Sequence, residues 1–399
     1  MARFLLLSNG HGEDISGALI GKQLQGAGHQ VDCLPLVGSG FAYKEAGIRL
    51  VGETKEFSTG GLGYTSLQGR LTELLQGQVF YLLRRLGRLL LIAHRYDLLI
   101  VIGDVIPVIA AWLTGRPVAT YLVAYSSHYE GRLRLPWPCG NCLASSRFLA
   151  VYSRDQLTGI DLTGQLKRPV HFLGNPFMDP VLESQARLPI CSYRLGLLPG
   201  SRHPELEKNI LLLLAVVEWL PEHQFTSGKL SLDMALVATM KASSIAALAS
   251  TRGWKLITGS CHQLVREQRH INLRWQSFNA VLHSSDLLLC MAGTAAEQAV
   301  GLAKPVLQLP GQGPQFTASF AEAQRRLLGP TVFCAAGEPG ETALLRDTAK
   351  LTMELLKRSQ QDTNLSEQCH DQAQRRLGSS GGANRLANAI TDLLASQRQ

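Results

Sequence analysis

Two glycine-bearing segments in the second half of this 399-residue sequence carry residues suited to binding a diphosphate. In the first, LLPGSRHPE, a tight turn at Gly200 is followed by Ser201 and Arg202 at the predicted start of a helix. Backbone N–H groups at a helix start, a hydroxyl and a guanidinium all donate hydrogen bonds to phosphate oxygens. The simpler interpretation is an ordinary turn with a serine cap and a surface arginine.

The second segment, MAGTAAEQAVGLAKPVLQLPGQGPQF, begins at the end of a predicted strand. Its small residues allow a helix N-terminus to come close to a ligand. We expect Gly293 and Thr294 to lie at the phosphates and Glu297 to accept hydrogen bonds from a ribose diol. Gln298 and Gln315 are further candidate contacts to the nucleotide-sugar. A solvated helix glutamate and a solvated loop glutamine are the alternatives.

A third segment, SNGHGED, opens the first predicted helix near the N-terminus. Its histidine and its first acid are candidates for acid or base catalysis, because glycines on both sides of the histidine let the backbone approach a substrate. The catalytic candidates here are His11 and Glu13, and the candidate contacts to an acceptor are Asn9, Gly10, Gly12 and Asp14. The alternative is that the two acids only complement the helix dipole.

Two more polar residues follow predicted strands of the first half. Asp104, in IGDVIP, is a candidate general base, because a carboxylate at a strand end can deprotonate a hydroxyl. The competing interpretation is a buried helix cap. His128, in VAYSSHYEG, is a weaker candidate for contact with an acceptor.

Short apolar strands that alternate with helices must position these residues. In the first half we expect strands at residues 4–7, 31–36, 98–102, 118–123, 149–152 and 170–173, with helices at 15–25 and 108–113. In the second half we expect strands at 194–198, 234–238, 255–257, 287–290 and 306–309, with helices at 205–220 and 294–301. Repeated βαβ units predict doubly wound parallel sheets, in which ligands bind at the carboxyl ends of the strands.

A chain of this length exceeds the size of one hydrophobic core, so two domains are expected. A polar, proline-containing stretch separates residues 1–182 from residues 190–377, and we predict two Rossmann-like α/β domains facing each other across a cleft. A glycine and serine hinge precedes a last helix within 384–399, which we expect to cross back to the first domain.

Composition excludes some classes of protein. The net charge is +8, but lysines and arginines are scattered without interleaved aromatics, which argues against nucleic-acid binding. The apolar run at the N-terminus is too short for a signal peptide, and the longest apolar stretch is interrupted by Asp104 and Pro107. Eight dispersed cysteines do not form a disulfide framework, and WPCGNC lacks a second ligand pair for zinc. We therefore expect a cytoplasmic protein.

Residues 67–94 combine apolar residues at helical spacing with arginines. The apolar stripe is Leu71, Leu75, Val79, Leu82, Leu86 and Leu90, and the arginines are Arg70, Arg84, Arg85 and Arg88. The simpler interpretation is a helix that packs on the core and exposes a basic face. The alternative is a peripheral membrane contact, with apolar side chains in the interface and arginines at anionic headgroups.

The sequence resembles the lipid-A-disaccharide synthase group of GT-B glycosyltransferases in three places. These are LLPGSR with Glu205, GTAAEQ with GLAKPVLQLPG, and GNPFMDP. The sequence is most similar to a poorly characterised branch of that group found in cyanobacteria, and more distantly resembles the UDP-GlcNAc transferase of peptidoglycan lipid II synthesis. The resemblance spans nearly the whole chain and is strongest in the C-terminal half. SNGHGED departs from the synthase pattern.

The resemblance implies an inverting hexosyltransferase that needs no metal or cofactor and uses a UDP-sugar as donor. The first domain would bind a lipid-linked or amphipathic acceptor and the second the donor, on the inner face of a membrane. It also implies that Asp104 is the essential acid that follows a strand of the N-terminal domain. Two alternatives stay open: a UDP-GlcNAc 2-epimerase-like enzyme, and a nucleotide-sugar-binding protein without catalysis. The sequence does not reveal the oligomeric state.

Overall fold

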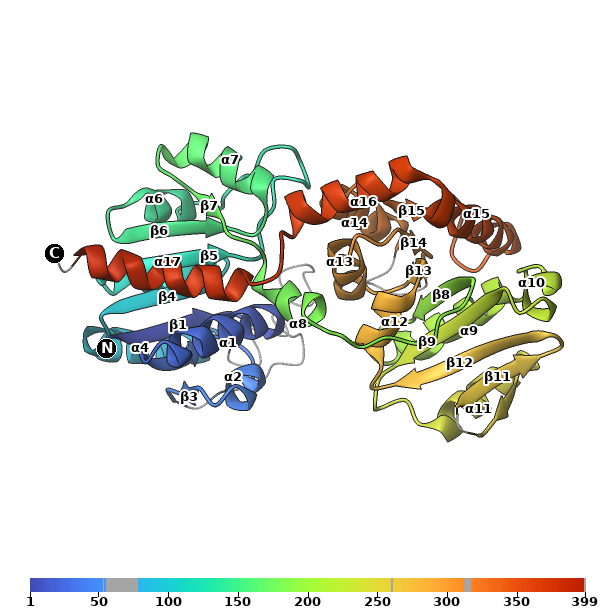
Figure 1. Cartoon of the computed structure of the whole chain (residues 1–399). Coiled ribbons are helices and arrows are strands. Elements are labelled where there is room, and N and C mark those ends of the chain that lie inside the picture. Colours follow the sequence, from blue (N-terminus) through green and yellow to red (C-terminus); the bar gives the residue numbers. More distant parts are fainter. Residues whose placement is uncertain (53, 55–77, 260, 312–316, 398–399) are drawn as a thin grey trace. The chain divides into compact units, whose positions relative to one another are not determined.

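The computed structural model describes residues 1–52, 54, 78–259, 261–311 and 317–397. The chain divides into two compact units (Figure 1). Unit 1 comprises Met1–Asp179 and Leu377–Gln399, and unit 2 comprises Pro180–Arg376.

Unit 1 contains, within its described residues, a seven-stranded sheet in the order β3-β2-β1-β4-β5-β6-β7. Its strands are β1 (Arg3–Ser8), β2 (Gln30–Pro35), β3 (Arg49–Leu50), β4 (Leu98–Gly103), β5 (Val118–Leu122), β6 (Phe148–Ser153) and β7 (His171–Phe172). All of these strands pair in parallel. The central strands are buried along their whole length, which explains why their sequences are continuous apolar runs.

Helices cover both faces of this sheet. They are α1 (His11–Gly26), α2 (Phe41–Glu45), α4 (Gln78–Ile92), α5 (Val105–Leu113), α6 (Cys139–Ala144), α7 (Gln156–Leu166) and α17 (Gly382–Gln397), with α8 (Asp179–Leu182) at the boundary between the units and short 3-10 turns at Ala93–Arg95 and Pro176–Met178. One apolar cluster joins α1, α2 and α17 to the sheet, and a second joins α4, α5, α6 and α7 to its other face.

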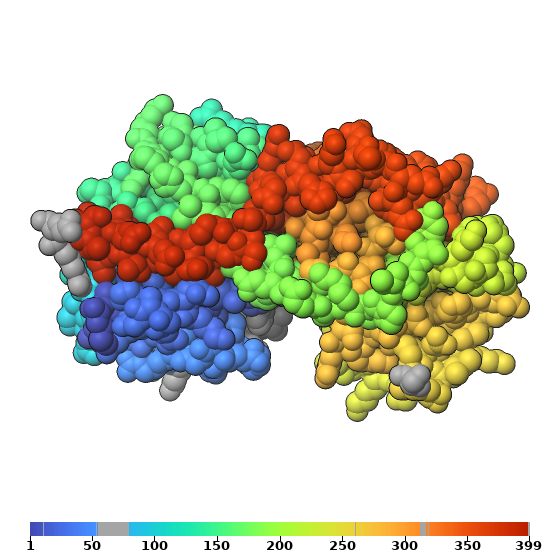
Figure 2. All heavy atoms as spheres, viewed as in Figure 1, coloured from blue at the N-terminus to red at the C-terminus, as the bar shows by residue number. Residues whose placement is uncertain are grey.

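The last helix completes unit 1. Figures 1 and 2 show α17 lying along α1, which it contacts directly. Asp179 accepts hydrogen bonds from the backbone N–H groups of Gly381, Gly382 and Ala383 at 2.8–2.9 Å. A carboxylate at this position satisfies donors at the start of α17 that have no partner inside the helix. The Asp179 carboxylate therefore joins the point where the chain leaves unit 1 to the point where it returns.

Unit 2 contains an eight-stranded sheet in its described part, in the order β10-β11-β12-β9-β8-β13-β14-β15. The strands are β8 (Tyr193–Leu198), β9 (Leu230–Leu236), β10 (Lys255–Ile257), β11 (His262–Arg266), β12 (Arg269–Trp275), β13 (Leu287–Cys290), β14 (Val306–Gln308) and β15 (Val332–Cys334). Strands β10, β11 and β12 form an antiparallel meander at one edge, and the remaining pairs are parallel.

The helices of unit 2 are α9 (Glu205–Val217), α10 (Glu222–Thr226), α11 (Ala242–Ser250), α12 (Phe278–Ser284), α13 (Gly293–Gly301), α14 (Ala318–Leu328), α15 (Thr342–Gln361) and α16 (Thr363–Arg376). The main apolar cluster joins α9, α10, α11 and α15 to one face of the sheet. Helix α12 packs on the opposite face, where Val281 and Leu288 close over Gly196.

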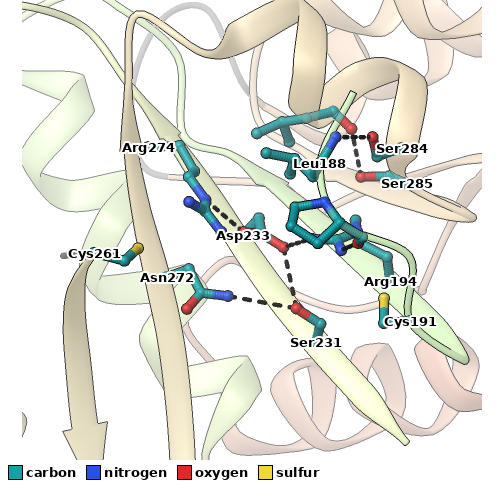
Figure 3. A network of polar contacts seen from close by, with 12 residues as sticks. Leu188, Cys191, Arg194, Ser231, Asp233, Cys261, Asn272, Arg274, Ser284 and Ser285 are labelled. Carbon is teal, nitrogen blue, oxygen red and sulfur yellow. Dashed lines mark hydrogen bonds and ion pairs between the residues drawn. The ribbon is translucent and has the colours of Figure 1, made fainter. Parts of the chain in front are cut away.

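A buried ion network lies on that opposite face and ties three strands together (Figure 3). The Asp233 carboxylate on β9 accepts hydrogen bonds from Arg194 on β8 and, at 2.7 Å, from Arg274 on β12. Ser231 adds a third donor at 3.2 Å. Arg194 also donates to the carbonyl of Pro189, so the network holds the segment that enters unit 2. Because Asp233 is fully buried, these donors must offset its lost hydration.

The structure confirms the predicted doubly wound α/β architecture and changes several details of it. Helix α1 begins at His11 and not near residue 15, and α5 begins at Val105 and not at residue 108. The sequence-based prediction did not include β11 and β12, and the second sheet is parallel only outside this meander. Leu264, Ile271 and Leu273 are buried while their neighbours are less so, an alternation typical of strands covered on one face.

Candidate functional site

The candidate site in unit 1 lies where the strand order reverses. The chain passes from β1 outward to β2 and β3, while β4 pairs with the other side of β1 and leads to β5. The loops that leave β1 and β4 therefore diverge at the carboxyl edge of the sheet, which is where open α/β sheets bind ligands. Asn9 follows β1 and Asp104 follows β4.

Asp104 is the N-cap of α5 and is also held by the neighbouring loop. Its Oδ1 accepts the Ile106 N–H at 3.1 Å, and its two oxygens lie 3.3 and 3.2 Å from Nδ2 of Asn9. Burial raises the pKa of Asp104 above its ordinary value, although the Ile106 and Asn9 hydrogen bonds act against this. A partly exposed carboxylate with a raised pKa and two fixed donors is suited to accept a proton from a hydroxyl.

Glu13 lies behind this carboxylate in the first turn of α1. Its Oε2 accepts the Asn9 N–H at 2.6 Å, and its carboxyl group lies against the backbone of Gly103. Burial, followed by the negative charges of Asp104 and Asp14, raises the pKa of Glu13 well above its ordinary range. Neighbouring carboxyls cannot ionise independently, so a proton held by Glu13 favours ionised Asp104.

The remaining candidates of SNGHGED take different positions. Asp14 is buried, and its Oδ1 accepts the Ser8 hydroxyl at 2.6 Å, while Tyr43 donates to Ser8 at 3.0 Å. Gly10 is the N-cap of α1 at φ 147°, and a side chain at Gly10 or Gly12 would meet nothing within 4 Å. His11 is the first residue of α1, and its side chain lies outside the described part of the structure.

His128 lies farther along the sheet edge, beyond β5. Its Nε2 is 3.7 Å from Oδ1 of Asp155, the residue that caps α7 after β6. The His128 backbone N–H donates to the Ser126 hydroxyl at 3.2 Å, and that hydroxyl donates to Asp155 at 2.7 Å. These hydrogen bonds connect His128 with the end of β6, whereas Asn9, Glu13 and Asp104 lie together at β1 and β4.

Sequence reasoning missed two residues of this site, Gly103 and Tyr125. The Tyr125 hydroxyl accepts the Val105 N–H at 3.2 Å, next to Asp104, whose charge adds to burial in raising the pKa of the phenol. Tyr125 stands three residues after β5, close to His128, so the signal was its place after a predicted strand. Gly103 has φ 154°, and only a glycine leaves room for Glu13 there.

The second candidate site lies at the corresponding edge of unit 2, where β8 and β13 are neighbours. The Met291 N–H donates to the Leu198 carbonyl at 2.9 Å, so the two predicted loops leave the sheet side by side. Gly200 has φ 98°, and a side chain there would lie 3.5 Å from the Met291 carbonyl oxygen and 3.6 Å from the Ala292 side chain. The turn that carries Gly200 therefore lies against the start of α13.

The residues predicted to bind a diphosphate line this edge of the sheet. Ser201 and Arg202 are exposed after the turn, and α13 begins at Gly293 without a side-chain cap. Thr294 is exposed in its first turn, and Glu297 and Gln298 are partly buried about one turn into the helix. An uncapped helix N-terminus offers N–H donors and a positive dipole end to an anion. Gln315 lies outside the described residues.

Residues next to the PGSR turn make contacts that were not predicted from the sequence. Buried Asn209 donates from Nδ2 to the Pro199 carbonyl at 2.8 Å, fixing the turn to α9. His203 lies between Glu207, at 2.6 Å from Nδ1, and Thr239, at 3.1 Å from Nε2. The spacing of His203, Glu207 and Asn209 at the start of a helix was the available signal.

The two cysteines of WPCGNC are buried, and burial raises the pKa of both thiols, to about 12 for Cys139. Thiols that hold their protons so strongly are poor nucleophiles at neutral pH. Cys139 and Cys142 lie on α6 and belong to the core cluster that joins this helix to the sheet.

Comparisons with known proteins identify the architecture. The calicheamicin glycosyltransferase CalG4 aligns over 99% of this chain and 98% of its own with a TM-score of 0.61 and 17% identity. A putative UDP-N-acetylglucosamine 2-epimerase from Listeria monocytogenes aligns over 99% and 97% with a TM-score of 0.57 and 13% identity. The glycosyltransferase of kitacinnamycin aligns over 98% and 99% with a TM-score of 0.55 and 15% identity. The chain has the GT-B fold.

At these identities the likeness establishes the fold and leaves the reaction to be argued from the sites. No family model and no curated protein sequence matches the chain. Glycosyltransferases and epimerases share the GT-B architecture, so the residues at the two sheet edges must distinguish them.

Proposed function

We propose that the chain is an inverting glycosyltransferase that moves a sugar from a UDP-sugar to a lipid-linked or amphipathic acceptor at the inner face of a membrane, related to lipid-A-disaccharide synthase. The observation that carries this proposal is the carboxyl pair of unit 1. Asp104 is oriented by the Asn9 amide and the Ile106 N–H, and Glu13 lies behind it. A protein that only bound a nucleotide-sugar would have no need for a proton acceptor oriented in this way.

In the proposed reaction the acceptor hydroxyl transfers its proton to Asp104 as its oxygen attacks the anomeric carbon of the donor. The bond from that carbon to the diphosphate oxygen breaks, and UDP leaves with the electron pair. Arg202 and the N-terminus of α13 would stabilise the negative charge that develops on the diphosphate. Ser201 and Thr294 would donate further hydrogen bonds, and Glu297 would bind the ribose. On this account the chain's own residues supply charge stabilisation that a metal ion gives in other enzymes.

An apolar groove supports a lipid-like acceptor. It has a volume of about 280 Å³ and lies between α4 and α5, lined by residues that include Leu82, Leu83 and Ile109. Ile106, whose N–H donates to Asp104, also lines it. A hydrocarbon chain in this groove would therefore lie beside the proposed base.

The surface of α4 supports contact with a membrane. Phe80 and Leu91 are each 74% exposed, while Leu89 is buried in the core, so the helix packs on the sheet and also presents an apolar surface. Arg84 and Arg88 are exposed beside it, where they would meet anionic headgroups. No helix in the described part of the chain is long and apolar enough to span a membrane.

One predicted member of the basic face is placed differently. Arg85 is buried, and its guanidinium donates to the carbonyls of Pro35 and Val51. The prediction that Arg85 faces outward was wrong, because its neighbours Pro35 and Val51 need donors in the core. Leu90, a member of the predicted apolar stripe, is exposed, and the candidates Leu71, Leu75 and Arg70 lie outside the described residues.

The proposal is tested with the full chain, UDP-N-acetylglucosamine carrying a labelled sugar, and a lipid extract as acceptor. We expect label in the lipid fraction, and a 10²–10⁴-fold loss of rate for Asp104→Asn. Asparagine still caps a helix, so this variant removes the base and keeps the fold. Thermal shifts with UDP, TDP and UDP-N-acetylglucosamine check the donor site, since a ligand that binds only the native state raises the melting temperature.

Three outcomes would contradict the proposal. Formation of a 2-epimer without acceptor would establish the epimerase alternative. A thermal shift with UDP but no product from any UDP-sugar would favour a binding protein without catalysis. No shift with any uridine nucleotide would refute the donor assignment in unit 2.

A further inference from the structure

The segment from Arg132 to Trp137, hereafter the 132–137 segment, combines exposed arginines with an exposed tryptophan. It lies between β5 and α6, and its Leu133 and Leu135 pack against the core cluster that holds α4, α5 and α6. Arg132 and Arg134 point outward, and Trp137 is 86% exposed. Tryptophan presents a large apolar ring with a polar N–H, which makes it a common anchor at membrane–water interfaces.

A pocket of about 790 Å³ lies beside this segment, and the proposed reaction does not use it. Arg132 and Arg134 line it together with the polar residues Asn141, Ser145 and Gln165. The Ser145 hydroxyl oxygen is buried and has no hydrogen-bond partner within the described residues. The exposed guanidinium groups of Arg132 and Arg134 are therefore the donors that the pocket offers to a polar ligand.

The net positive charge of the side chains that line the pocket favours an anionic ligand. Its lining includes two arginines and one acid, Glu130, which lies 3.9 Å from Arg134. Both partners of this pair are highly exposed, so the interaction is weak and leaves the guanidinium able to bind another group. Arginine matches phosphate oxygens with two parallel hydrogen bonds.

We propose that the 132–137 segment and its pocket bind the phosphate-bearing headgroup of an anionic membrane lipid, with Trp137 inserted at the interface. The exposed ring favours a bilayer over a free phosphate, because a dissolved anion gains nothing from an apolar side chain beside it. The segment packs on the same core cluster as α4, so the two lie on the same face of the unit 1 sheet. The inference rests on the proposed membrane location, and it adds a separate lipid site to it.

Vesicle co-sedimentation of the full chain tests this site. Vesicles of phosphatidylcholine alone are compared with vesicles of phosphatidylcholine and phosphatidylglycerol. We expect the wild type to bind the anionic vesicles, and Arg132→Gln/Arg134→Gln to bind them roughly 10- to 30-fold more weakly. The matched control is Arg346→Gln/Arg375→Gln in unit 2, which removes two exposed charges and should bind as the wild type does. Equal loss in both double variants would show a nonspecific charge effect and overturn the proposal.

Tryptophan quenching tests the insertion. Brominated phosphatidylglycerol should quench part of the wild-type fluorescence, and Trp137→Phe should remove that part, whereas Trp219→Phe in unit 2 should retain it. Unchanged quenching in Trp137→Phe would refute the insertion. If free glycerol phosphate displaces the protein from vesicles at concentrations similar to those of the lipid headgroup, the ligand is a soluble anion and the lipid proposal fails. A UDP-induced thermal shift in each variant reports donor binding separately, so failure of this site is distinguishable from failure of the proposed function.

Discussion

Gly103→Ala tests the arrangement of the unit 1 site most directly. A methyl group at this position would lie 2.6 Å from Oε2 and 2.9 Å from Cδ of Glu13, while ordinary contact begins near 3.4 Å. The carboxyl group must therefore move by about 0.8 Å, which can lengthen the 2.6 Å hydrogen bond from the Asn9 N–H to about 3.4 Å, beyond the usual range. The backbone adds strain, because φ 154° disfavours residues with a side chain.

The two effects have comparable size. Strain at an unfavourable φ costs about 1–3 kcal/mol, and weakening the hydrogen bond costs up to about 1 kcal/mol. We therefore expect the free energy of unfolding of unit 1 to fall by about 2–4 kcal/mol. For a unit of this size, the melting temperature should fall by roughly 4–16 °C. The assay is thermal unfolding followed by circular dichroism, with a UDP thermal shift to confirm that unit 2 is intact.

Gly115→Ala is the matched control, because Gly115 has φ 70° and nothing within 4 Å of an added methyl group. It carries the backbone strain without the collision. The double variant Gly103→Ala/Glu13→Ala keeps the strain and removes the collision, so its two changes should be less costly together than their sum. If Gly103→Ala costs no more than Gly115→Ala, Glu13 does not lie against Gly103 and the site geometry described above is wrong.

Three other predictions concern different parts of the chain. Because the pKa of Glu13 is raised in the folded state, its contribution to stability is full below the ordinary carboxyl range and is lost as the pH rises through the folded pKa. We therefore expect Glu13→Gln to become more stable relative to the wild type with increasing pH, by at most about 1.4 kcal/mol per pH unit. Urea titrations at several pH values measure this difference. Asp233→Ala leaves Arg194 buried without its carboxylate and should lower the unfolding free energy of unit 2 by about 3–5 kcal/mol in the same assay. Leu83→Asp places a charge in the α4–α5 groove and should lower kcat/KM for a long-chain acceptor roughly 10- to 100-fold while sparing a short-chain analogue; equal loss for both acceptors would contradict the groove's role.

The sequence predicted the sheets well because parallel strands buried on both faces are short apolar runs. Residues 98–102 and 287–290 are such runs, and their predicted bounds agree with those of β4 and β13 to within one residue. The meander of β11 and β12 was missed because it is covered on one face only, and its arginines and histidines hide the apolar alternation.

The helix starts were harder to predict than the strands. The apolar period of α1 begins near residue 15, but hydrogen bonding begins at Gly10, whose carbonyl accepts the Asp14 N–H at 2.8 Å. This difference moves Glu13 from a loop into the first helical turn. The pairing of Glu13 with Gly103 joins residues ninety positions apart, and no local pattern in one sequence reports such a contact. The same limit applies to the pairing of the Gly200 turn with the start of α13.

The sequence left Asp104 either as a base or as a helix cap, and the geometry makes these roles compatible. A carboxylate has about four lone-pair sites, and the cap uses one of them for the Ile106 N–H. Asn9 binds both oxygens at longer distances and fixes the plane of the group, so capacity remains for a hydroxyl proton. Capping also sets the rotamer of Asp104, so in the proposed reaction no entropy would be lost in ordering this side chain. Burial raises its pKa and strengthens it as a base, and the second carboxyl, Glu13, can stay neutral beside it. The geometry of this helix cap is therefore compatible with the proposed role of Asp104 as an oriented, partly desolvated base.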